Sequence, residues 1–176
     1  MTSDWNPWRF VAHDARYDDH AEAARTVREA VSSTVNTWVD LDHSALVELS
    51  GGLDSSIVAI SLQGRDSHVA LCSLKTPIAG TDERIYAQQV ADQLQLPLDV
   101  LDLGVEDVTV DPLPPPSSVA PRMGVLQHAV SDVLAAAGKR HQVNSHLSGA
   151  GGDTVFCYLS NASPAVDALR TRGLAA

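Results

Sequence analysis

The chain has 176 residues with 22 acidic and 12 basic side chains, a length that suits one globular α/β core and a formal net charge of −10 at pH 7. This charge argues against nucleic-acid binding, because a phosphate polyanion is repelled unless a basic surface compensates, and the basic residues are scattered singly. No stretch is long and apolar enough to span a membrane, and no basic segment with an apolar core opens the chain, so we expect a cytoplasmic protein.

The first elements follow from the spacing of apolar residues. Apolar side chains recur every three or four positions over residues 20–39, which predicts a helix, and residues 1–19 precede it as an N-terminal extension. The apolar run 45–49 is expected to be a strand. A glycine turn follows, and a second helix is predicted to start at Ser55 and to end near Gly64.

The rest of the chain repeats this alternation of strands and helices. Strands are predicted over residues 69–74, 98–103 and 142–147, and helices over residues 82–94, with acidic residues in the first turn, and 124–137. Strands that alternate with helices at this spacing predict an α/β fold, a parallel sheet flanked by helices with ligands at its carboxyl edge. Five prolines in residues 111–121 exclude regular structure there and predict a stiff loop, a lid or a spacer.

The glycine turn after the first predicted strand carries the sequence Ser50-Gly51-Gly52-Leu53-Asp54-Ser55-Ser56. Glycine tolerates positive φ and lets backbone N–H groups approach a ligand, and the helix start adds unpaired donors and the positive end of a dipole. Ser50, Ser55 and Ser56 supply further hydroxyl donors. Asp54 is expected to bind Mg²⁺, because a carboxylate in an anion site needs a bridging cation. The alternative is a plain glycine turn capped by serine and aspartate.

A second glycine turn follows the last predicted strand, with the sequence Ser148-Gly149-Ala150-Gly151-Gly152-Asp153. Both turns follow strands, and the carboxyl ends of parallel strands meet at one edge of a sheet. We therefore expect Asp54 and Asp153 to hold one Mg²⁺ between them.

The first turn resembles the PP-loop of ATP pyrophosphatases, which cleave ATP between the α and β phosphates, and lacks the Gly-Lys-Ser/Thr ending of a Walker loop. Its full heptamer is similar to that of asparagine synthetases and their relatives, the β-lactam synthetases and lasso peptide cyclases. The resemblance covers about residues 5–169 and implies an adenine nucleotide alpha hydrolase-like fold. It makes residues 20–176 an asparagine synthetase-like ATP-binding domain.

The second turn resembles the S-G-x-G-x-D-E-x-F stretch of asparagine synthetases. The resemblance implies that Ser148 and Gly149 touch the nucleotide and that Asp153 helps to hold Mg-pyrophosphate. The acidic residue that the family has after the first Ser-Gly is Ala150 here, and alanine neither transfers a proton nor positions ammonia. This departure favours a lasso peptide cyclase over an enzyme that joins ammonia to free aspartate.

The resemblance also implies an adenine pocket lined by Leu49 and Cys72, at the ends of the first two strands, although apolar residues at strand ends also pack against helices. Cys72 and Cys157 lie in apolar surroundings and are expected to be buried, reduced thiols.

The activity implied by the resemblance is ATP- and Mg²⁺-dependent adenylation of a carboxylate, with release of pyrophosphate, for amide or isopeptide bond formation. The expected substrate is a precursor peptide that forms a ring; asparagine synthesis and an inactive nucleotide-binding remnant or scaffold are the alternatives. Family members continue into a helical lobe that we expect to be absent after Ala176. An apolar face left uncovered there predicts self-association or a partner chain.

Overall fold

The computed structural model describes residues 16–75, 82–103, 125–155, 166 and 169. The expected proline-rich lid, Cys157 and most of the N-terminal extension lie outside these residues, so those expectations stay predictions. Asp19 caps the first helix, because its carboxylate accepts a hydrogen bond of 2.8 Å from the amide of Ala21.

The sheet contains β1 (Ser44–Glu48), β2 (His68–Lys75), β3 (Leu98–Asp102) and β4 (Ser145–Ser148). The strand order is β3-β2-β1-β4, and every pair of neighbours is parallel. The helices are α1 (His20–Asp42), α2 (Leu53–Ile60), α3 (Arg84–Leu94), α4 (Val125–His141) and α5 (Gly152–Val155). The predicted α/β fold with a parallel sheet is confirmed.

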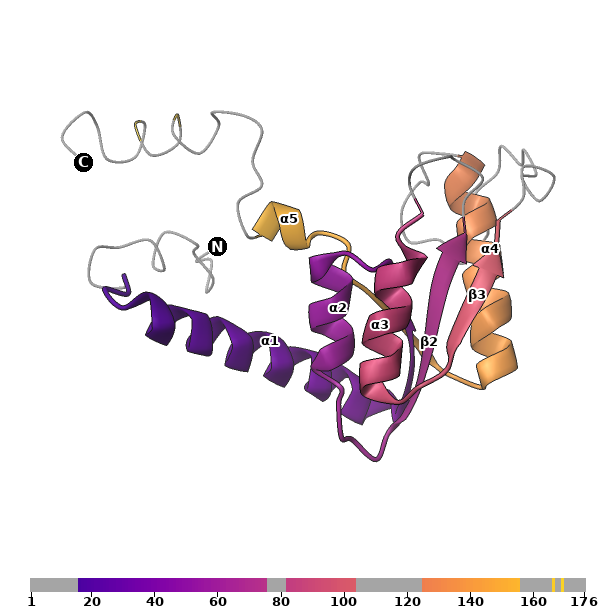
Figure 1. The fold of residues 1–176 in the computed structure, drawn as a ribbon, viewed down its shortest axis with the longest axis horizontal. Coiled ribbons are helices and arrows are strands. Elements are labelled where there is room, and N and C mark those ends of the chain that lie inside the picture. The colour runs from indigo at the N-terminus through magenta and orange to yellow at the C-terminus, as the bar shows by residue number, and fades with distance from the viewer. Residues whose placement is uncertain (1–15, 76–81, 104–124, 156–165, 167–168, 170–176) are drawn as a thin grey trace, which may run out of the picture.

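Two layers of helices cover the sheet, α1, α2 and α3 on one face and α4 on the other (Figure 1). Side chains of β1 alternate between the two faces. Ala45, Val47 and Leu49 pack toward the first layer, and Leu46 packs in the cluster that contains Ala137 of α4. A strand buried on both faces is mainly apolar, as in parallel sheets, which explains the apolar residues at 45–47 and 49; Glu48 interrupts this run.

The strand order reverses between β1 and β4. From β1 the chain moves outward to β2 and then β3, and it returns through α4 to place β4 on the other side of β1. Right-handed crossovers put helices on opposite faces when the direction of travel reverses. The loops after β1 and β4 therefore border one crevice at the carboxyl edge of the sheet, which is where open parallel sheets bind ligands.

Two helices begin at residues other than those predicted. α2 starts at Leu53 instead of Ser55, because Gly52 adopts an extended conformation (φ −73°, ψ 167°) and serves as its N-cap. This start places Asp54 in the first helical turn. α3 starts at Arg84, so its acidic residues precede the first turn, and the Asp82 carboxylate accepts hydrogen bonds from the Arg84 amide and guanidinium.

The predicted end of α4 was four residues too early. Gly138 lies inside the helix, which ends where Gln142 turns to φ 55°. The last turn carries Lys139, Arg140 and His141, and basic side chains stabilise the negative end of the helix dipole. β4 then starts at Ser145, three residues later than predicted.

Candidate functional site

A cavity of about 410 Å³ lies at the carboxyl ends of β1 and β4, in the crevice at the reversal of strand order. Its lining comes from the end of β1, the start of α2 and the loop after β4: Glu48, Ser50, Gly52, Leu53, Asp54, Ser55, Ser148, Gly149, Ala150 and Asp153. Seven of the predicted site residues lie in this set. The two glycine turns therefore form the walls of one cavity.

The serines of the first turn brace the loop. The Ser55 hydroxyl donates to the carbonyl of Gly52 at 3.2 Å and accepts from the amide of Ser50 at 3.2 Å. The hydroxyls of Ser50 and Ser55 are 2.9 Å apart, and Ser50 also accepts from the amide of Gly52. Since each hydroxyl has one hydrogen, this pattern makes Ser50 the donor to Ser55. The Ser56 hydroxyl donates to the Gly52 carbonyl at 2.7 Å.

The hydroxyl hydrogens of these three serines are thus used inside the loop, which limits the donors that the turn offers to a ligand. The amides of Leu53 and Asp54 make no hydrogen bond within the part of the chain that the structure describes. They belong to the first turn of α2, where backbone N–H groups have no intrahelical partner. An anion at this end of α2 would meet unpaired amides and the positive end of the helix dipole.

Gly149 brings the second turn against the backbone of α2. A Cβ atom added to Gly149 would lie 2.3 Å from the nitrogen of Ser55 and 2.7 Å from the carbonyl carbon of Asp54. Only glycine fits at such a distance, because backbone atoms cannot rotate away. The close approach fixes the loop after β4 over the N-terminus of α2.

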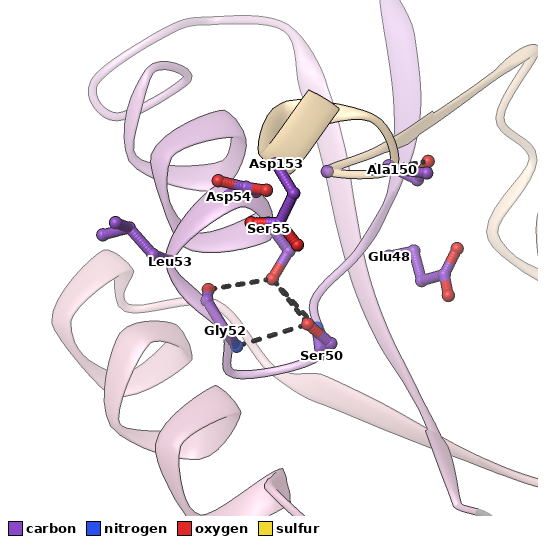
Figure 2. A pocket seen from close by; sticks show the side chains of 10 residues that line it. Glu48, Ser50, Gly52, Leu53, Asp54, Ser55, Ala150 and Asp153 are labelled. Carbon is purple, nitrogen blue, oxygen red and sulfur yellow. Dashed lines mark hydrogen bonds between the residues drawn. The ribbon is translucent and has the colours of Figure 1, made fainter. Parts of the chain in front are cut away.

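Gly152 makes the corresponding contact with a side chain. A Cβ atom at this position would lie 2.2 Å from Oδ2 of Asp54, so the Asp54 carboxylate packs directly on the start of α5. Asp153 is the next residue. Its side chain extends from α5 into the same cavity, beside Asp54 and Ser55 (Figure 2). Both aspartates line one cavity, and that they hold one Mg²⁺ between them stays a prediction.

Gly51 anchors the first turn from the other side. It has φ 95°, and a Cβ atom there would lie 2.5 Å from the Glu83 carbonyl oxygen and 3.0 Å from the Ala87 nitrogen. A side chain would therefore meet the backbone of α3 as well as conformational strain. Gly51 does not line the cavity, and it contributes by letting the loop pack against α3.

The chemistry of the donor set fits Mg²⁺. Magnesium is a hard cation that proteins bind through one or two carboxylates together with waters and substrate phosphates. Asp54 and Asp153 supply two such carboxylates. Among the residues that the structure describes, no group of three or more His, Cys, Asp or Glu side chains is arranged to hold a metal ion. The arrangement suits a cation bound jointly with a phosphate.

The side chains of Leu49 and Cys72 are placed in the core. Both are fully buried, Leu49 in the cluster beneath α2 and α3 and Cys72 in the cluster beneath α4, and neither lines the cavity. The Leu49 amide donates to the Cys72 carbonyl at 2.7 Å. Burial raises the pKa of the Cys72 thiol to about 12, so this cysteine is a packing residue in this structure. Its expected role beside adenine stays a prediction.

Glu48 was missed in the sequence. It is the last residue of β1 and lines the cavity, and its side chain is 27% exposed. Its Oε2 atom lies 3.5 Å from Nε2 of His146 on the neighbouring strand β4. One signal was available in the sequence, because a glutamate interrupts the apolar residues two positions before the turn that begins at Ser50.

Taken together, the parallel sheet, the cavity at its switch point and the two glycine turns define an α/β domain of the nucleotide-binding type. A sequence model of the asparagine synthase family matches residues 26–172, which is more than half of the chain. The protein therefore belongs to the asparagine synthase family.

No curated protein sequence matches the chain significantly. Among solved structures, it is similar to an NH3-dependent NAD synthetase from Campylobacter jejuni subsp. jejuni NCTC 11168, in complex with the nitrate ion, with 15% identity and a TM-score of 0.49. The match covers 69% of this chain and 54% of the NAD synthetase chain, so the protein spans about half the length of that structure.

In the described segments, no helix combines the length and the apolar character that crossing a membrane requires.

Proposed function

We propose that the cavity binds Mg-ATP and that the protein adenylates a carboxylate, releasing pyrophosphate, so that an amine can then form an amide or isopeptide bond. The observation that carries this proposal is the contact of Gly152 with the Asp54 carboxylate, which joins two distant aspartates at one helix N-terminus. A triphosphate there would meet the unpaired amides of Leu53 and Asp54 and a cation held by the two aspartates.

The residues of the cavity would hold the metal that offsets negative charge on the phosphates, and they would hold the phosphates in place. When bound, Mg²⁺ would offset the charge that develops on the leaving pyrophosphate. Asp54 and Asp153 would hold it, and the braced loop would fix the phosphates so that the α-phosphorus faces the attacking carboxylate. The carboxylate oxygen would form a bond to the α-phosphorus while the bond to the β-phosphate oxygen breaks, giving an acyl adenylate and pyrophosphate.

The substrate that we propose is a precursor peptide that supplies both a side-chain carboxylate and its own N-terminal amine, as in lasso peptide cyclases. Ala150 supports this choice, because it lines the cavity where the resemblance to asparagine synthetases requires a glutamate. A small residue leaves room for a bulkier acceptor than ammonia. Free aspartate is the competing substrate.

ATP–pyrophosphate exchange tests the proposal. The protein is incubated with labelled pyrophosphate and Mg-ATP, with either free aspartate or linear peptides that have a free N-terminus and an internal Asp or Glu. We expect exchange that requires Mg²⁺ and a peptide, and its loss in both Asp54→Ala and Asp153→Ala. Asp66→Ala, an exposed aspartate at the opposite edge of the sheet, is the matched control.

The competing functions give different results. Exchange stimulated by aspartate alone would indicate asparagine synthesis. Mg-ATP binding in calorimetry without any exchange would indicate a nucleotide-binding scaffold. Exchange that is indifferent to both aspartate substitutions would overturn the metal-site assignment.

A further inference from the structure

Glu48 occupies a different wall of the cavity from the two aspartates. Side chains alternate along β1, so Glu48 shares the face of Leu46, whereas α2, with Asp54, covers the opposite face. Figure 2 shows the Glu48 carboxylate across the cavity from Asp54 and Asp153, on the side of Ala150. One ion held between the aspartates would lie across the cavity from Glu48, whose carboxylate pairs with the His146 ring at 3.5 Å.

The charges of the cavity lining indicate what kind of ligand Glu48 would bind. The described residues that line it include three carboxylates and no lysine or arginine. A carboxylate facing a triphosphate site is repelled unless a positive charge lies close to it, because charges in a partly enclosed cavity are weakly screened. The aspartates meet this requirement with the metal. Glu48 lies apart from that metal; His146 flanks it on β4, and an amine substrate in its ammonium form would bring a positive charge to its cavity side.

His146 supplies a second group that handles protons at the same place. His146 and Glu48 lie on neighbouring parallel strands, and their side chains approach to 3.5 Å between Nε2 and Oε2. The His146 side chain is 40% exposed, so a proton on its ring has a path to solvent. Cys72, on β2, is in register with Glu48. Burial raises the pKa of its thiol to about 12, so the thiol is neutral and does not compete with His146 for the Glu48 carboxylate.

We propose that Glu48 is a catalytic residue that binds the ammonium group of the amine acceptor and accepts its proton, with His146 as the relay to solvent. This inference rests on the function proposed above and names its second half-reaction. Glu48, on β1, would then be the proton acceptor of the site, a role that Ala150 on the facing loop cannot fill because alanine has no acidic group.

The chemistry then balances. An α-amino group has a pKa of ~8, so at neutral pH it arrives mostly protonated and without a free lone pair. It gives one proton to Glu48, and its nitrogen attacks the acyl carbon of the adenylate. The new C–N bond forms and the C–O bond to AMP breaks, so AMP leaves. The nitrogen loses its second proton by the same route, through Glu48 and His146.

Two nucleophiles separate this role from a structural one. An alkyl amine such as methylamine is protonated at pH 7 and must lose a proton before it can attack, whereas hydroxylamine is largely neutral and attacks without this first deprotonation; both lose one further proton after the attack. The protein is supplied with Mg-ATP and the acidic peptide that supports exchange, its N-terminus acetylated, and mass spectrometry measures the alkylamide and the hydroxamate. Glu48→Gln keeps the shape and removes the charge, and Glu29→Gln, exposed on α1, is the control.

We expect Glu48→Gln to lower the ratio of alkylamide to hydroxamate by ~10²–10⁴-fold relative to the unaltered protein, with pyrophosphate exchange still measurable. His146→Gln should reduce alkylamide formation by a smaller factor. Equal losses with both nucleophiles, or no loss with either, would overturn the role of Glu48 and leave the adenylation proposal standing. Loss of exchange with a raised Mg²⁺ requirement would make Glu48 a metal ligand instead. No exchange in the unaltered protein would overturn both proposals.

Discussion

Replacement of Gly149 by alanine tests the contact that joins the two glycine turns. The new Cβ atom would lie 2.3 Å from the Ser55 nitrogen, roughly 1 Å inside ordinary van der Waals contact. Gly149 does not have positive φ, so the substitution changes only the space and not the backbone preference. The Ser55 nitrogen and the Asp54 carbonyl carbon, which the new Cβ atom would meet, both belong to the backbone of α2. The clash is therefore relieved only if the loop after β4 moves away from the helix.

The expected magnitudes follow from this movement. Overpacking against rigid backbone costs about 1–3 kcal/mol of unfolding free energy, which for a chain of this size lowers the melting temperature by roughly 2–12 °C. The loop carries Asp153, and a displacement of about 1 Å in a catalytic group lowers rates by ~10²-fold. We therefore expect both a lower melting temperature by calorimetry and a ~10²-fold slower pyrophosphate exchange.

Two other glycines provide matched comparisons. In Gly152→Ala the new Cβ atom meets the Asp54 carboxylate, which can rotate away, so exchange should fall while the unfolding free energy changes by less than ~0.5 kcal/mol. In Gly138→Ala the nearest atom is Cγ2 of Val143 at 3.7 Å, and alanine in a helix should stabilise by about 0.5–1 kcal/mol without affecting exchange. A Gly149→Ala protein that melts and exchanges like the unaltered one would refute the contact.

Two further predictions concern single side chains of the sheet. Cys72 should resist iodoacetamide at pH 8 in the native protein and react in denaturant, because burial raises its thiol pKa to about 12; equal labelling in both states, by peptide mass spectrometry, would contradict its burial. Asp99 accepts hydrogen bonds from His141 and Arg140, which lower its pKa. Its native pKa thus lies below the unfolded value of ~3.9, so its stabilisation exists above that pH and disappears as the pH falls further. Asp99→Asn should lower the unfolding free energy by about 0.5–1 kcal/mol at pH 7, and urea titrations should show this difference shrinking as the pH falls below ~3.9.

The elements were predictable because their signals are local. The run 45–49 reads as a buried strand whatever its neighbours are, and the residues of α1 repeat with the helical period. Local signals failed where packing decides. A glycine at 138 weakens a helix by only ~1 kcal/mol, and Ala137, fully buried against the sheet, helps to keep α4 intact through it. The hydroxyl hydrogens of the first turn bond within the loop, which the sequence did not indicate, and the expected role of these serines toward a ligand stays a prediction.

The sequence by itself determined the alternation of strands and helices and the chemistry of each glycine turn, because both depend on residues adjacent along the chain. The tertiary structure alone decided the strand order β3-β2-β1-β4, and with it the meeting of the loops after β1 and β4. The contact of Gly152 with Asp54 and the pairing of Glu48 with His146 follow from that order. Such contacts join segments far apart in sequence, and no local pattern encodes which strand lies beside which, since that choice is made by packing of the whole sheet.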